Sequence, residues 1–134
     1  MVMDETMIVA GIGSRKGVAA KDVLAAIDAA LTAHGLSRSE IDCLATAPLK
    51  RDEPALRAAS TAIGRELVIV DDEALHATAS RTLTHSGLSL AMTGAPSVSE
   101  ASALAAAGPV SRLLGPRILL GSVTCAIAVD GDMS

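Results

Sequence analysis

The strongest constraint on the fold of this chain is an apolar run that ends in glycine and leads into an amphipathic segment. Met7 to Gly13 (MIVAGIG) has the composition of a strand buried on both faces. The segment Val18 to His34 carries apolar residues at helical spacing, and Gly35 supplies a left-handed stop. This succession predicts the first half of a β-α-β unit.

The next two elements complete and repeat that unit. Ser37 and Glu40 form the S-x-x-E pattern of a capping box ahead of a second strand, Ile41 to Ala47. A helix from Pro54 to about Gly64 separates it from a third strand, Leu67 to Val70. Strands that alternate with helices predict right-handed crossovers and helices on both faces of one sheet.

The segment after the third strand is predicted to be helical at both ends. Asp71 or Asp72 caps a short helix that runs to about Ser80. Thr82 to Pro96, rich in Thr, Ser and Gly, receives no assignment. A further helix, Ala101 to Ala107, stops at a Gly-Pro pair.

Two apolar segments at the C-terminal end predict a hairpin. Arg117 to Leu120 and Val123 to Val129 flank Gly121-Ser122, the pattern of a two-residue type II′ turn. We therefore predict one three-layer α/β/α domain over residues 1–134, with a mixed, mostly parallel sheet and a C-terminal hairpin. Residues 1–6 are predicted to be a loose tail.

Composition excludes several classes of function. The chain has 134 residues and no Phe, Tyr or Trp, so it cannot stack bases on aromatic rings. Its net charge of −4 gives no general attraction to nucleic acid or to an anionic membrane. No signal peptide or membrane span is predicted. Cys43 and Cys125 lie far apart in apolar runs, which indicates reduced, buried thiols and a cytoplasmic protein.

The turn after the first strand is the first candidate site. Its sequence is Gly11-Ile12-Gly13-Ser14-Arg15-Lys16-Gly17. Glycines let backbone amides approach a ligand, the following helix presents N–H groups, and the two basic residues add positive charge. The spacing G-x-G-x-x-x-G differs from the dinucleotide fingerprint and from the phosphate loop. The turn is therefore either an anion-binding, substrate-binding segment or a tight turn with two solvated cations.

The loop after the second strand is expected at the same edge of the sheet. It carries Lys50, Arg51, Asp52 and Glu53. Lys50 is a candidate for holding ligand carboxylates there. The alternative is a solvated charged loop in which Asp52 only caps the next helix.

Two residues are candidates for chemistry. Glu100 is an isolated acidic residue and a candidate general acid or base, although a capping box with Ser97 explains it as well. Ser97 is also a substrate-binding candidate. Thr124 lies in an apolar strand, where it either reaches a ligand from the sheet end or is an ordinary strand former. His76 and His85 lack partners at metal-ligand spacing, so neither a metal nor a cofactor is predicted.

The order and spacing of several stretches resemble the family formed by CobE and the C-terminal domain of CbiG, proteins of cobalamin biosynthesis. The resemblance implies a three-layer α/β domain. Members often have cysteine at the position of Ser14, so a nucleophilic thiol is not supported here. The stretches are GIGSRKG with its helix (Gly11 to Leu31), LATAPLKRDEPAL (Leu44 to Leu56), GAPSVSEASAL (Gly94 to Leu104) and PRILLGSVTCAIA (Pro116 to Ala128).

The resemblance also implies a ligand class. The two-domain family enzyme opens the ring-A lactone of cobalt-precorrin-5A and expels acetaldehyde, and this chain is similar to its C-terminal part only. Free-standing relatives belong to the aerobic route. We expect a precorrin or corrin polycarboxylate to be bound or handed over. The alternatives are a precorrin-lactone hydrolase or lyase that uses Glu100 or Thr124, and a purely structural subunit. Further candidate partners are other enzymes of the pathway and a second copy of the chain.

Overall fold

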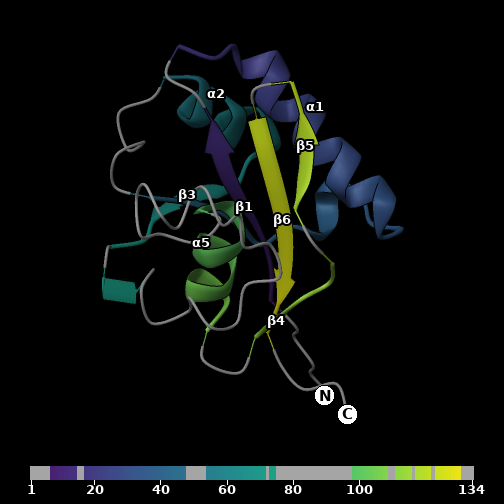
Figure 1. The fold of residues 1–134 in the computed structure, drawn as a ribbon. Helices are drawn as coiled ribbons and strands as arrows, with labels where there is room; N and C mark the ends of the chain where they lie inside the picture. Colours follow the sequence, from purple (N-terminus) through teal and green to yellow (C-terminus); the bar gives the residue numbers. More distant parts are fainter. Residues whose placement is uncertain are drawn as a thin grey trace.

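The computed structural model describes residues 7–14, 17–47, 54–71, 73–74, 98–108, 111–115, 117–121 and 123–130. Helices and strands alternate along the first half of the chain, and three strands follow the last helix (Figure 1). The elements are β1 (Ile8–Ser14), α1 (Ala20–Ala33), the 3-10 turn η1 (Arg38–Glu40), β2 (Cys43–Thr46), α2 (Pro54–Ile63), β3 (Glu66–Ile69), α5 (Val98–Ala107), β4 (Arg112–Leu113), β5 (Ile118–Leu120) and β6 (Val123–Val129).

The six strands of the described residues belong to one mixed sheet. Its order is β3-β2-β1-β6-β4, and β5 pairs with β6 beside β4. The strands β1, β2 and β3 are parallel to one another, whereas β6 is antiparallel to β1, β4 and β5. The pairing of β5 with β6 confirms the predicted C-terminal hairpin.

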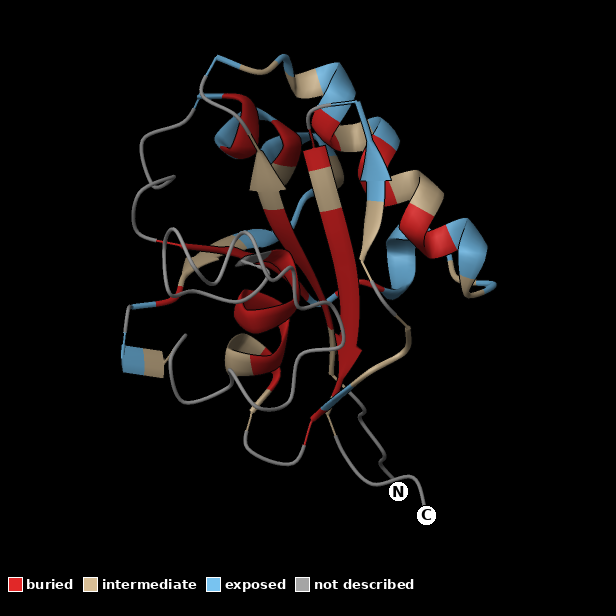
Figure 2. Cartoon of the chain, viewed as in Figure 1, coloured by how far each residue is buried: buried red, intermediate tan, exposed pale blue. Residues whose placement is uncertain are grey.

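Helices cover the sheet on both faces, which confirms the predicted α/β domain (Figure 1). Helices α1 and α2 pack on one face through large aliphatic residues such as Ile12, Ile27 and Leu56. Helix α5 packs on the other face, where Leu104 meets small residues such as Ala128. Most of β6 is buried between these layers (Figure 2). Alanine allows α5 to approach the sheet closely, because its side chain is a single methyl group.

Several local predictions are confirmed by hydrogen bonds. The capping box is present: the Ser37 N–H donates to Glu40 Oε2 at 2.9 Å, although the element is the short turn η1. The Ala74 N–H donates to Asp71 Oδ1 at 2.8 Å, so Asp71 is a cap. Gly35 has φ +70° and ends α1, as predicted.

Some predicted boundaries are wrong by a few residues. β1 continues to Ser14 instead of ending at Gly13, because its pairing with β6 extends that far. α1 begins at Ala20, two residues after the predicted start. The predicted helix to Ser80 beyond residue 74 and the segment 82–96 lie outside the described residues. Over the described part of the chain, no helix has the length and apolarity needed to cross a membrane.

Candidate functional site

The carboxyl ends of the parallel strands meet along one edge of the sheet. β1 ends at Ser14, β2 at Thr46 and β3 at Ile69. Ligands of open α/β sheets are generally held outside this edge. Gly13 and Ser14, two residues of the predicted ligand-binding turn, are the last residues of β1 and lie at this edge.

Gly11 lies inside β1 and is covered by α5. A Cβ at this position would come within 2.7 Å of the backbone nitrogen of Ala103 and would also overlap the carbonyl oxygen of Ser99. Both atoms belong to α5. The interpretation of Gly11 as the start of an open turn is therefore corrected: the turn begins after Ser14, and glycine at position 11 allows a helix to pack on the strand.

Two of the predicted site residues are register partners. Gly13 of β1 lies opposite Thr124 of β6, and Thr124 Oγ1 donates a hydrogen bond of 3.3 Å to the carbonyl oxygen of Gly13. On the other side of β1, the buried Thr46 donates to the carbonyl oxygen of Ile12 at 2.8 Å. Two threonine hydroxyls thus bind the carbonyl groups of Ile12 and Gly13, just before the end of β1, and help to fix this part of the strand.

Ser14 has an unusual environment at the end of β1. Its Oγ is buried and has no hydrogen-bond partner among the described residues. A buried hydroxyl is normally paired, so the Ser14 Oγ is a candidate donor to a ligand. The next described helix, α1, has Ala19 at its N-cap and therefore no side-chain cap. The first N–H groups of a helix have no intrahelical acceptor and favour an anion.

Arg15, Lys16 and Lys50, together with Ser97, lie outside the described residues. Gly17 is described, is exposed and follows the turn with φ +80°. The substrate-binding assignment of these five residues therefore stays a prediction.

Glu100 lies in the first turn of α5 and is fully buried. Its Oε2 accepts a hydrogen bond of 2.8 Å from the backbone N–H of Arg117. Arg117 follows the bend between β4 and β5, where Leu114 still donates to Ile127 of β6. The Glu100 carboxylate therefore satisfies a backbone donor at this bend and joins α5 to β5.

Two residues at this edge were missed by the sequence analysis. Arg117 is the only basic residue of the C-terminal hairpin and is partly buried. Leu119 of β5 is 65% exposed and pairs with Thr124. A signal was present in the sequence, since a two-residue turn at Gly121-Ser122 sets Leu119 opposite Thr124. Arg117 lies two residues before Leu119 and therefore on the same face.

Neither cysteine is a candidate nucleophile. Burial raises the pKa of the Cys125 thiol to about 12 and is the main cause that raises the pKa of Cys43 to about 11. Both side chains are buried and free, as predicted. Among the described residues, no group of three or more His, Cys, Asp or Glu is arranged to hold a metal ion.

The fold and this edge define a class: a small three-layer α/β domain whose polar positions gather where its parallel strands end. The chain belongs to the family described as the cobalamin synthesis G C-terminus, which matches residues 8–128. This confirms the resemblance found in the sequence and places the chain in cobalamin biosynthesis.

Three relatives show how far the similarity extends. The chain is 30% identical over 121 residues to the protein CobE of Sinorhizobium sp, covering 90% of this chain and 79% of that protein. It is similar to the 1.7 Å crystal structure of CobE, a protein from the cobalamin (vitamin B12) biosynthetic pathway, with a TM-score of 0.87, 35% identity and coverage of 96% and 94%. It is also similar to the cobalamin biosynthesis protein chiG from Agrobacterium tumefaciens str. C58, with a TM-score of 0.75, 50% identity and coverage of 94% and 100%.

Proposed function

We propose that this protein binds a precorrin or corrin polycarboxylate and hands it over within cobalamin biosynthesis. The bound carboxylates would lie at the end of β1 and at the start of α1. The observation that carries this proposal is the buried Oγ of Ser14, which has no partner among the described residues and precedes a helix without a side-chain cap.

The chemistry of such a ligand suits this edge. Corrin precursors carry acetate and propionate groups around a flat, apolar ring. Backbone N–H groups at a helix N-terminus and hydroxyl groups donate to carboxylates. Because the net charge of the chain is −4, the attraction must be local. Arg15, Lys16 and Lys50 are the proposed local cations, with Gly13, Gly17 and Ser97 as further contacts.

The alternative, hydrolysis of a precorrin lactone, receives less support. A general acid or base must reach the substrate within hydrogen-bond distance. Glu100 is fully buried and holds the backbone of Arg117, and the Thr124 hydroxyl donates to Gly13. These contacts give both residues structural roles, and we propose binding in preference to catalysis.

A titration with cobyrinic acid, a corrin polycarboxylate, tests the proposal. The chain has no tryptophan or tyrosine, so binding is followed by the visible absorption of the corrin or by calorimetry. We expect saturable binding, and binding at least about tenfold weaker for the fully methylated ester because charge-assisted hydrogen bonds are lost. If the chain binds neither cobyrinic acid nor its metal-free analogue, the proposal is overturned and a structural subunit is favoured.

A matched pair of variants tests the role of Ser14. Ser14→Ala removes a hydroxyl that has no described partner, so the free energy of unfolding should be unchanged or slightly higher. Affinity for cobyrinic acid should fall about tenfold or more, because a hydrogen bond to a charged group contributes about 1.5–3 kcal/mol. Ser39→Ala, on the exposed turn η1, is the control and should leave affinity unchanged. Equal affinities of the two variants would remove Ser14 from the site.

A further inference from the structure

Arg117 is held at a defined place beside α5. Its backbone N–H donates to the buried Glu100 carboxylate at 2.8 Å, and the next residue, Ile118, pairs with Cys125 of β6. The backbone of Arg117 is thus fixed from two sides, by a helix and by the sheet. Its side chain is partly buried and forms no salt bridge with a carboxylate of the described residues. A cation in such a place is available for an anionic ligand.

The neighbours of Arg117 lie on the face of the sheet that α5 covers. Gly11 contacts α5, and Gly13 follows two residues later on the same face. Thr124 is the register partner of Gly13, and Leu119 is that of Thr124. Register partners share a face, so Gly13, Thr124 and Leu119 form a row across three adjacent strands, β1, β6 and β5.

The row combines three kinds of chemistry. Leu119 is 65% exposed and apolar, Thr124 has a hydroxyl, and Arg117 lies two residues before Leu119 with a positive charge. A row across three strands spans roughly 10 Å, which is comparable to the width of a tetrapyrrole ring. We call Gly13, Arg117, Leu119 and Thr124 the Arg117 surface.

We infer that the Arg117 surface binds one peripheral carboxylate of the corrin through Arg117 and the adjoining apolar edge of the ring through Leu119. This inference rests on the proposed function and extends the site from the start of α1 to the α5 face of the sheet. Glu100 is then a positioning residue, because it holds the backbone of Arg117 without contacting the ligand.

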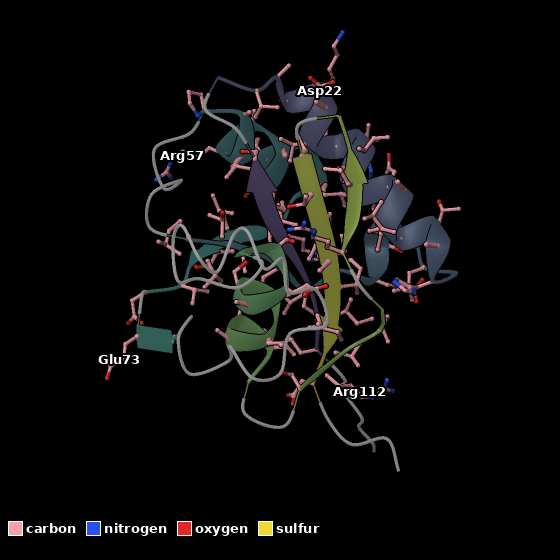
Figure 3. All side chains as sticks on the ribbon, in the orientation of Figure 1. Asp22, Arg57, Glu73 and Arg112 are labelled. Carbon is pink, nitrogen blue, oxygen red and sulfur yellow. The ribbon has the colours of Figure 1, made fainter. Side chains whose placement is uncertain are left out.

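Paired variants with cobyrinic acid as the probe test the inference. Arg117→Gln keeps the backbone N–H that Glu100 binds, so the fold is retained. Arg112→Gln is its control, since Arg112 is exposed on β4 beside Val129, at the end of the sheet where β1 begins (Figure 3). We expect Arg117→Gln to weaken binding about tenfold and Arg112→Gln less than about twofold.

The leucines of β5 supply a second matched pair. Leu119 and Leu120 are adjacent and both exposed, at 65% and 42%, but they lie on opposite faces of the strand. Leu119→Ala should weaken binding about threefold, whereas Leu120→Ala should not. With the methyl ester of cobyrinic acid, the effect of Arg117→Gln should vanish and that of Leu119→Ala should remain.

The outcomes separate this inference from the proposed function. If the wild-type chain binds cobyrinic acid but the Arg117→Gln and Arg112→Gln variants bind it with equal affinity, the Arg117 surface is not part of the binding site. The proposed function then stands. If the Leu119→Ala and Leu120→Ala variants bind cobyrinic acid with equal affinity, the ring does not lie on this face and the inference is overturned. If the wild-type chain binds no corrin polycarboxylate, both are wrong.

Discussion

Gly11 of β1 and Ala103 of α5 are in direct backbone contact. A methyl group at position 11 would lie 2.7 Å from the Ala103 nitrogen and 2.8 Å from its Cβ. The absence of a side chain at Gly11 therefore sets how closely α5 lies on the sheet. It also sets the position of Glu100, three residues before Ala103, and through Glu100 that of Arg117.

Gly11→Ala should destabilise the fold strongly. The added methyl group meets backbone atoms of α5, which cannot move without displacing the helix, and such overpacking costs about 1–3 kcal/mol or more. Chemical denaturation followed by circular dichroism measures the change. Gly115→Ala is the control, because a Cβ there meets the tip of the flexible His34 side chain at 2.9 Å. Equal losses of the free energy of unfolding in the two variants would contradict this account of Gly11.

Substitutions of Glu100 should separate a structural role from a chemical one. Glu100→Gln keeps an oxygen that accepts from the Arg117 N–H, so the free energy of unfolding should change by less than about 1 kcal/mol. Glu100→Ala leaves that donor unpaired next to a cavity and should cost about 2–4 kcal/mol. Complementation of a strain that lacks the gene measures pathway function. A Glu100→Gln protein that folds normally but fails to restore cobalamin synthesis would assign the carboxylate a chemical role.

Charge changes at Arg15 and Lys16 should act on binding asymmetrically. Replacing both residues by Glu adds repulsion to a polycarboxylate, whereas replacing both by Gln only removes attraction. The Glu pair should therefore weaken cobyrinic acid binding far more than the Gln pair. Binding to the wild-type chain should also weaken as salt rises, because exposed charges act over about 8 Å at physiological ionic strength. Calorimetric titrations at two salt concentrations measure both effects, and salt-independent binding would show that the ring face alone is recognised.

The two buried thiols predict a loss of stability at high pH. Burial raises the pKa of Cys125 to about 12, above the ordinary value of 9.0 that the unfolded chain regains. The folded state then binds the proton more tightly than the unfolded state. The contribution of the Cys125 thiol to the free energy of unfolding is complete below pH 9 and is lost as the pH rises toward 12. Denaturation curves between pH 8 and about pH 11 should show this decline, and Cys125→Ala should reduce its slope. An unchanged slope in that variant would contradict the assignment.

Much of the architecture follows from local sequence. The buried run Met7 to Gly13, the helix stop at Gly35 and the hairpin after Leu120 were all predicted. Each depends on hydrophobic periodicity or on a conformation that few residue types adopt, and both are visible within a short window of sequence. The family was also recognised from the order of four short stretches.

The position of Glu100 and the role of Gly11 were decided only by tertiary structure. The sequence spacing of Glu100 to Ser97 stays a prediction of a capping box, because Ser97 lies outside the described residues. The hydrogen bond from the backbone N–H of Arg117 to the Glu100 carboxylate spans 17 residues, and no local pattern indicates it. In the same way, the glycine pattern of residues 11–17 predicts one continuous turn, whereas α5 covers Gly11 and leaves Gly13 beside Thr124. Local patterns report which conformations a segment can adopt. Which groups meet is set by how α5 packs across the sheet, because that packing joins residues about 90 positions apart in the chain.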